Sequence, residues 1–128
     1  MTLDDLKQYE LVYLATPYTL YYMGLDQAYT DACRLTSDLM VRGIRSFSPI
    51  AQGHGLSVEA GVSPGAVSLW YWFNQGYMNK CDALVVGCLH GWLESKGVQH
   101  EIAEFLKQRK PRYLLDPFTR TVTKMVDS

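Results

Sequence analysis

The sequence predicts a single α/β domain built on a doubly wound, mostly parallel sheet of four or five strands. Three observations predict this fold class. Short apolar runs of strand length alternate with longer segments whose apolar residues recur at helical spacing. Helix-length connections between strands are what parallel pairing requires. The length of 128 residues, with 48% hydrophobic and 20% charged residues, fits one domain that spans residues 1–128.

The first half of the chain contains a strand, a helix and a second strand. The apolar run 11–16 ends before Pro17 and predicts a strand that is buried on both faces. Residues 26–41 carry apolar side chains at helical spacing, and Gly43 follows as a helix stop. A second strand is predicted at 44–47. Together these segments predict a parallel βαβ unit with a right-handed crossover.

The middle of the chain combines an irregular segment with an aromatic helix. Residues 50–63 contain three glycines and little periodicity, which predicts a long loop of the kind that is uncommon unless it lines a site. The helix predicted at 66–78 follows Pro64 and carries Trp70 and Trp72. Such side chains belong more often to a core or a subunit contact than to a substrate platform, and the sequence leaves these alternatives open.

The second half of the chain repeats the alternation. A third strand is predicted at 83–89, a helix at 97–109 and a fourth strand at 112–115. Residues 119–126 alternate weakly between apolar and polar and could add an edge strand. The order of elements again favours parallel strands joined by helices.

Composition excludes several functional classes. A net charge of −1 offers no electrostatic footprint for nucleic acid or an acidic membrane, so a small ligand is the expected partner. Neither phosphate-binding glycine motif, G-x-G-x-x-G or G-x-x-x-x-G-K-[ST], is present. The three cysteines include no C-x-x-C pair, which favours a reducing cytoplasm and argues against a metal site. No cofactor is expected, and no apolar run predicts a membrane span. The charged first ten residues do not resemble a signal peptide.

The most informative feature lies where the third strand meets the following helix. Ser95 and Glu101 occupy this junction, and ligands of open α/β sheets bind beyond the carboxyl ends of the strands. The helix dipole is expected to keep Glu101 ionised and able to act as a nucleophile. Glu104, further round the helix, is expected to face solvent. The same pattern is also typical of a helix start that is merely capped.

Weaker candidates lie in other loops. Thr16 and Tyr18 follow the first strand and could bind phosphate or sugar hydroxyls. His54 could hold a phosphate or a base, although a lone loop histidine is usually solvated. His90 and His100 have no partner at metal spacing and are predicted to be surface residues.

Several segments taken in order resemble a known superfamily. They are Tyr13–Tyr18, Phe47–Ile50 with His54, Cys81–Val86, Gly91-Trp92 with Ser95 and Gly97, and Glu101. Over residues 11–116 the chain resembles the nucleoside 2-deoxyribosyltransferase-like superfamily. More narrowly, it is similar to the small bacterial and phage branch of unassigned function (DUF1937-like).

The resemblance implies a flavodoxin-like, Rossmann-like domain with a five-stranded parallel sheet. It implies a homodimer or homotetramer, for which Trp70, Trp72 and Tyr77 would serve as interface anchors. The implied activity is N-glycosidic cleavage of nucleosides or nucleoside 5′-monophosphates, ending in hydrolysis or in base transfer.

The resemblance also implies roles for individual residues. Glu101 would be the nucleophile that attacks C1′ of the sugar, and Tyr13 would orient it. Ser95 stands where the transferases carry an aspartate for the 5′-hydroxyl and the nucleotide hydrolases carry a serine for the 5′-phosphate. A neutral donor in place of a negative charge favours a 5′-monophosphate. Gly97 would let the ligand approach the helix start.

The remaining implied contacts come from other segments. Thr16, Tyr18, His54 and Trp92 would bind the substrate. The sequence departs from the superfamily at Asn74, where an aspartate usually serves the departing base. An amide can hydrogen-bond a base but cannot protonate it, so the chain could also be a nucleotide-binding module with impaired catalysis.

Overall fold

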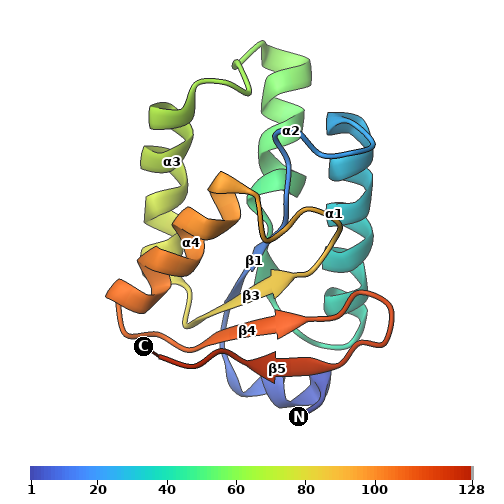
Figure 1. Ribbon diagram of the computed structural model, residues 1–128, viewed down its shortest axis with the longest axis vertical. Coiled ribbons are helices and arrows are strands. Elements are labelled where there is room, and N and C mark those ends of the chain that lie inside the picture. Colours follow the sequence, from blue (N-terminus) through green and yellow to red (C-terminus); the bar gives the residue numbers. More distant parts are fainter. Residues whose placement is uncertain (128) are drawn as a thin grey trace.

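Five strands form one sheet in the order β2-β1-β3-β4-β5, which confirms the predicted fold class (Figure 1). The structure is a computed structural model and describes residues 1–127. Its elements are a 3₁₀ helix Leu3–Gln8, β1 Val12–Ala15, α1 Leu25–Val41, β2 Ser46–Phe47, α2 Pro49–Ala60, α3 Val67–Lys80, β3 Ala83–Gly87, α4 Lys96–Lys107, β4 Arg112–Leu115 and β5 Val122–Lys124. Among these residues, no helix has the length and apolar character needed to cross a membrane.

The first four strands are parallel, whereas β5 pairs antiparallel with β4. This edge strand corrects the fully parallel sheet that the superfamily resemblance implies. The segment between β4 and β5 is too short for a crossover helix, and such a connection can join only antiparallel neighbours. The weak alternation at residues 119–126 predicts this additional strand.

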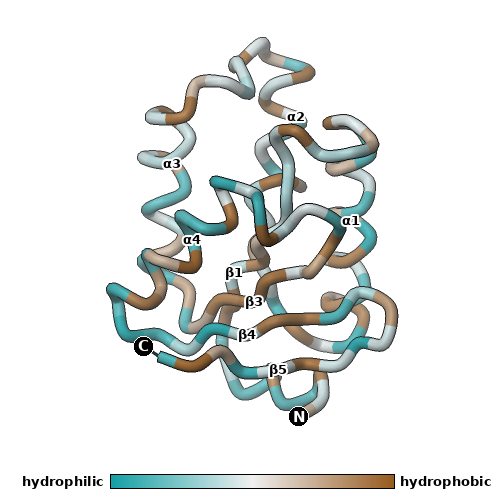
Figure 2. Tube along the Cα trace, viewed as in Figure 1, coloured by the Kyte–Doolittle hydropathy of each residue, from teal (hydrophilic) through white to brown (hydrophobic). Residues whose placement is uncertain are grey.

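The central strands are buried on both faces, as their apolar runs predict, and Figure 2 shows them as hydrophobic segments. Because strand side chains alternate, Leu14 packs on one face with Leu35 and Leu39 of α1. On the opposite face Tyr13 packs with Phe105 of α4. The two helices therefore cover opposite faces of the sheet and place the start of α4 at the carboxyl ends of the strands.

Gly87, at the end of β3, permits a close approach between layers. A Cβ atom at this position would lie 2.5 Å from Leu35 Cδ2 and 3.0 Å from Thr16 Cγ2. Only a residue without a side chain lets α1 and the segment after β1 come this near to the strand end.

The predicted loop at residues 50–63 is wrong, because most of this segment forms α2. Ser48 caps the helix through its Oγ, which accepts a hydrogen bond from the Ala51 amide at 3.1 Å, and Pro49 occupies the first turn. Gly61 ends the helix with φ 76°. Inside it, Gly53 lies against Trp70, where a Cβ atom would come within 3.1 Å of the indole. Packing against α3 therefore outweighs the low helix propensity of glycine.

Helices α2 and α3 rise together beyond the sheet, joined by residues 61–66 (Figure 1). The carboxamide of Gln75 on α3 donates to the Glu104 carboxylate on α4 at 2.9 Å. Met78 is the buried side chain of α3, whereas Trp72 is 73% exposed. The aromatic helix is thus largely a surface element rather than part of the core.

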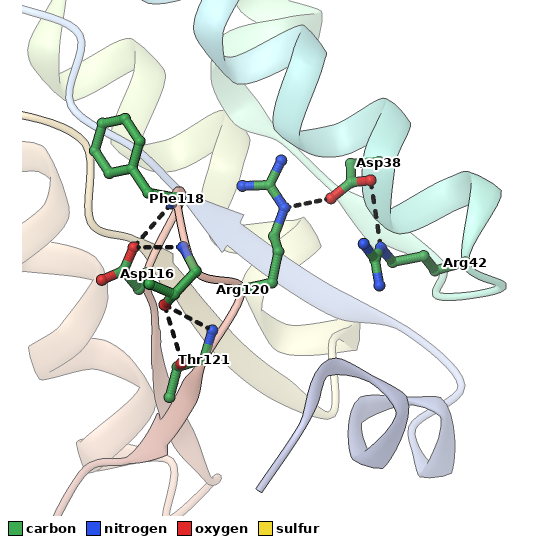
Figure 3. Close-up of polar contacts among 7 residues, drawn as sticks. Asp38, Arg42, Asp116, Phe118, Arg120 and Thr121 are labelled. Carbon is green, nitrogen blue, oxygen red and sulfur yellow. Dashed lines mark hydrogen bonds and ion pairs between the residues drawn. The ribbon is translucent and has the colours of Figure 1, made fainter.

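The turn between β4 and β5 is held by side chains that Figure 3 shows. The Asp116 carboxylate accepts a hydrogen bond from the amide of Phe118 at 2.8 Å. Arg120 pairs with Asp38 of α1 at 2.6 Å, and Asp38 also pairs with Arg42 at 3.3 Å. These contacts tie the edge hairpin to α1 and lie apart from the cavity described below.

Candidate functional site

A cavity of about 640 Å³ lies at the carboxyl ends of the parallel strands. Residues 16–22, which follow β1, form one wall, and α2 and α3 form another. The first turns of α4 complete it. This is the position at which open α/β sheets bind ligands, and the volume is in the range of small-molecule sites.

Glu101 lines this cavity, and behind it the buried Tyr13 contacts its carboxyl group. The Tyr13 hydroxyl donates to Glu101 Oε2 over 2.5 Å, and Tyr13 is fully buried while Glu101 is 8% exposed. Tyr13 comes from β1 and Glu101 from the second turn of α4. Burial, together with the adjacent Glu101, raises the pKa of Tyr13 well above its usual range, so the phenol keeps its proton and acts as a donor.

Burial also decides the charge of Glu101. Within residues 1–127 no cation pairs with it, and burial raises its pKa from 4.5 to about 8, although the hydrogen bond from Tyr13 acts in the opposite direction. The expectation that the helix dipole keeps Glu101 ionised is therefore wrong for the unliganded protein. The dipole acts mainly on the first turn, whereas Glu101 is the sixth residue of α4. The protonated acid predominates at neutral pH.

The start of α4 forms a polar wall of the cavity. Ser95 caps the helix, and its Oγ accepts from the Val98 amide at 3.3 Å. Lys96 and Gly97 follow and also line the cavity. A Cβ atom at Gly97 would meet only Ser95 Oγ, at 4.0 Å, so internal packing does not require a glycine here. The exposed helix amides, the lysine and the serine hydroxyl together suit an anionic group.

Thr16 lies in the same cavity, directly after β1. Its side chain is nearly buried, and Oγ1 has no hydrogen-bond partner among the described residues. A buried hydroxyl without a partner costs free energy. The position next to the cavity makes a ligand or a water molecule its natural partner.

Tyr18 and His54 form a second polar group that lines the cavity. The Tyr18 hydroxyl lies 2.8 Å from His54 Nδ1, and His54 Nε2 lies 3.1 Å from the Asp26 carboxylate. The imidazole stacks on Tyr29 with the ring centroids 4.6 Å apart. His54 is 8% exposed and lies within α2, so the predicted loop position and the alternative of a solvated histidine are wrong.

Asn74 lies on α3 and lines the cavity, partly buried. Trp70 and Tyr71 line it from the same helix. His100 stacks on Tyr71 with ring centroids 3.9 Å apart, and its Nε2 is buried without a partner among the described residues. The prediction that His100 is a surface residue is wrong. Its place one residue before Glu101 on a helix that borders the cavity was the available signal.

Two expectations from the helix region differ from the structure. Trp92 packs partly buried against the core cluster under α4 and is not among the residues that line the cavity. Glu104 does not simply face solvent, because its carboxylate accepts hydrogen bonds from Gln75 and Gln108. Glu94, an exposed residue on the cavity wall, is not indicated by any motif in the sequence. It lies in the connection that shapes the start of α4.

The described residues contain no group of three or more histidine, cysteine or acidic side chains that could hold a metal ion. Cys33, Cys81 and Cys88 are free thiols. Burial raises the pKa of Cys81 to about 12 and also raises that of Cys88, so neither thiol is an activated nucleophile.

The sheet and the cavity above its strands define a Rossmann-like α/β domain with one buried carboxyl group at its main cavity. The chain belongs to the family described as a domain of unknown function (DUF1937), whose model matches residues 10–116. The matched range contains β1 to β4 and all the residues that line the cavity. No curated protein matches the chain significantly.

Proposed function

We propose that this protein is an N-glycosidase that cleaves the bond between base and sugar in ribo- or deoxyribonucleoside 5′-monophosphates. The observation that carries the proposal is the buried pair of Glu101 and Tyr13 at a cavity that also contains a helix start. A carboxyl group that is held by a phenol and is itself largely buried is suited to attack or stabilise an electron-poor sugar carbon.

In the proposed reaction, ionised Glu101 attacks C1′ and the bond from C1′ to the base nitrogen breaks, with its electron pair leaving on the base. The resulting glycosyl ester is then attacked by water, or by a second base in a transfer reaction. The transition state carries positive charge on the sugar, which a carboxylate in a poorly solvated site stabilises strongly. Tyr13 donates to Glu101 and holds the carboxyl group in position.

The start of α4 is proposed to hold the 5′-phosphate. Lys96 supplies a positive charge, and the serine hydroxyl of Ser95 supplies a neutral donor. Thr16 has an unpartnered hydroxyl that can serve the sugar or the phosphate. The proposed arrangement places the sugar over Glu101, between this polar wall and the helices α2 and α3.

The residues available to protonate the leaving base favour a second candidate function as well. Asn74 lines the cavity but its amide cannot protonate a base. Two carboxyl groups also line the cavity: Glu94 is exposed, and Glu101 is the proposed nucleophile for the sugar. A protein without a placed acid for the base loses roughly two to four orders of magnitude in rate. The second candidate is therefore a nucleotide-binding module in which catalysis is impaired.

The test incubates the protein with a panel of ribo- and deoxyribonucleoside 5′-monophosphates and measures released base by chromatography. Wild type is compared with Glu101→Gln, which preserves the shape of the side chain and its bond to Tyr13. Glu104→Gln, on the same helix but outside the cavity lining, is the matched control. Release by wild type and Glu104→Gln but not by Glu101→Gln supports the glycosidase. Thermal stabilisation by nucleotides without release from any of them supports the binding module.

We also propose that the protein acts in the cytoplasm as a homodimer or homotetramer. The free thiols are consistent with a reducing compartment. Apolar side chains on α3, including Val67, Leu69 and Trp72, are exposed and available for a subunit contact. Sedimentation at micromolar concentration tests the assembly, and a purely monomeric species would contradict it.

A further inference from the structure

His54 connects the hydroxyl of Tyr18 to the carboxylate of Asp26. The two ring nitrogens of His54 lie 2.8 Å from the Tyr18 oxygen and 3.1 Å from the Asp26 carboxylate. A carboxylate can only accept, so Nε2 of His54 carries the ring proton and donates it to Asp26. In the neutral imidazole Nδ1 is then an acceptor, and among the described residues the Tyr18 hydroxyl is the donor that lies beside it. We assign the tautomer from this chain of partners.

The tautomer of His54 determines whether Tyr18 donates or accepts a hydrogen bond toward a ligand. Burial, and after it the charge of Asp26, raises the pKa of Tyr18 above its ordinary value, so the phenol stays protonated. Its single proton points to His54, which leaves lone pairs on the oxygen for the cavity that Tyr18 lines. Toward a ligand, Tyr18 is therefore an acceptor and not a donor. Asp26 sets this polarity although it does not line the cavity and is 97% exposed.

The residues proposed to bind the phosphate and the sugar indicate which part of a nucleotide contacts Tyr18. In the proposed complex the first turn of α4 holds the phosphate and Glu101 faces the sugar, which leaves the base to Tyr18 and to the wall formed by α2 and α3. Aromatic side chains on that wall, such as Trp70, suit the flat faces of a base.

We propose that Tyr18 determines base specificity, accepting a hydrogen bond from an exocyclic amino group and thereby selecting adenine or cytosine nucleotides over their oxo counterparts, hypoxanthine and uracil. The inference rests on the proposed function, because it requires a nucleotide in the cavity. An oxo group at the same position of the base would place its oxygen, an acceptor, against the Tyr18 oxygen, which is also an acceptor. The cavity is open enough for water to relieve part of this mismatch, so the expected preference is roughly tenfold in Kd.

Asp26→Asn is the decisive variant. An asparagine amide can donate to Nε2 of His54, which allows the ring proton to move to Nδ1 and frees the Tyr18 proton to face the cavity. The preference is then expected to shrink to within about threefold. Glu59→Gln is the matched control, because it removes the same charge from an exposed position on α2 that does not line the cavity. Tyr18→Phe, which removes the acceptor itself, is expected to abolish the preference.

The experiment measures Kd for AMP against IMP and for CMP against UMP by calorimetry. All proteins carry Glu101→Gln so that the nucleotides are not consumed. Nitrogen NMR of His54 in the unliganded proteins reports the tautomer, at a pH well above the ordinary imidazole pKa of roughly 6.5. A preference for AMP and CMP that Asp26→Asn loses and Glu59→Gln keeps, with the proton on Nε2 in the parent, supports the proposal.

The opposite outcomes separate this inference from the proposed function. Nucleotide binding without an amino preference, or a ring proton on Nδ1 of His54 in the parent protein, overturns the role of Tyr18 and leaves the proposed function standing. If no nucleotide binds to these proteins and none is cleaved by wild type, both the role of Tyr18 and the proposed function are overturned.

Discussion

The hydroxyl of Tyr13 donates to Glu101 across 2.5 Å, although the two residues are 88 positions apart in the chain. The parallel pairing of β1 with β3 and the packing of α4 on the sheet bring them together. Because both side chains lie among apolar groups, the phenol keeps its proton and the carboxyl group resists ionisation.

The first prediction concerns stability and pH. The pKa of Glu101 rises from 4.5 to about 8 on folding, so between these values the folded protein holds a proton that the unfolded chain has lost. Stability therefore falls as pH rises through this window, by up to about 1.4 kcal/mol for each pH unit. Glu101→Gln removes the ionisation, and its free energy of unfolding is expected to exceed that of wild type increasingly from acidic to mildly alkaline pH. Denaturant titrations at several pH values measure the difference.

The control for this prediction is Glu104→Gln on the same helix. Hydrogen bonds from Gln108 and Gln75 lower the pKa of Glu104, so it stays ionised in the folded and unfolded states throughout the upper part of the window. Its substitution should leave the pH dependence of wild type in place there. A parallel pH dependence of wild type and Glu101→Gln would contradict the raised pKa.

The second prediction concerns the hydrogen bond itself. The Tyr13 hydroxyl opposes the effect of burial on Glu101, so Tyr13→Phe should raise the pKa of Glu101 further. If ionised Glu101 is the nucleophile, the acid limb of kcat/KM for base release lies near pH 8 and moves to higher pH in the variant. At neutral pH the rate should fall about tenfold for each pH unit by which this limb moves.

Tyr9→Phe provides the comparison for that substitution. Tyr9 hydrogen-bonds Tyr113 and packs against the cluster on the α1 face of the sheet, away from Glu101. Its pH profile should match wild type. An acid limb that does not move in Tyr13→Phe would show that the phenol does not tune the carboxyl group.

The third prediction separates stability from ligand binding at Gly97. A Cβ atom there meets only Ser95 Oγ at 4.0 Å, and alanine favours a helix over glycine by about 1 kcal/mol. Gly97→Ala should therefore leave thermal stability unchanged or raise it. The added methyl group lies at the cavity wall, so nucleotide affinity should fall. Unfolding curves and binding isotherms on one preparation test both halves, and unchanged affinity would exclude close contact of a ligand with this turn.

The fourth prediction concerns the packing at Gly87. Gly87→Ala places a Cβ atom 2.5 Å from Leu35 Cδ2, which forces core side chains to shift at a cost of about 1–3 kcal/mol. Gly55→Ala on α2 is the matched control, since nothing lies within 4 Å of its Cβ position. It should stabilise the protein slightly. Equal effects of the two substitutions in chemical denaturation would contradict the close approach of α1 to β3.

Much of the fold is predictable from local pattern. Uninterrupted apolar runs such as Ala83–Gly87 indicate strands buried on both faces, and helical spacing predicts α1 and α4. Helix α2 is the element that local pattern does not predict. Its start signal, serine followed by proline, was present, but the glycines inside it suggested a loop. Contact between Gly53 and Trp70 is invisible to local pattern because it depends on α3.

Some features of the candidate site can likewise be predicted from local sequence, whereas others depend on tertiary packing. Local sequence pattern is enough to find the residues of chemical interest near the strand ends, among them Thr16, Ser95 and Glu101, because strand ends and helix starts are local features. The charge of Glu101 and the hydrogen-bonding polarity of Tyr18, in contrast, follow from the packed structure and not from local pattern. Both depend on desolvation and on hydrogen-bond partners from distant segments, and these exist only when the sheet and its helices are packed together.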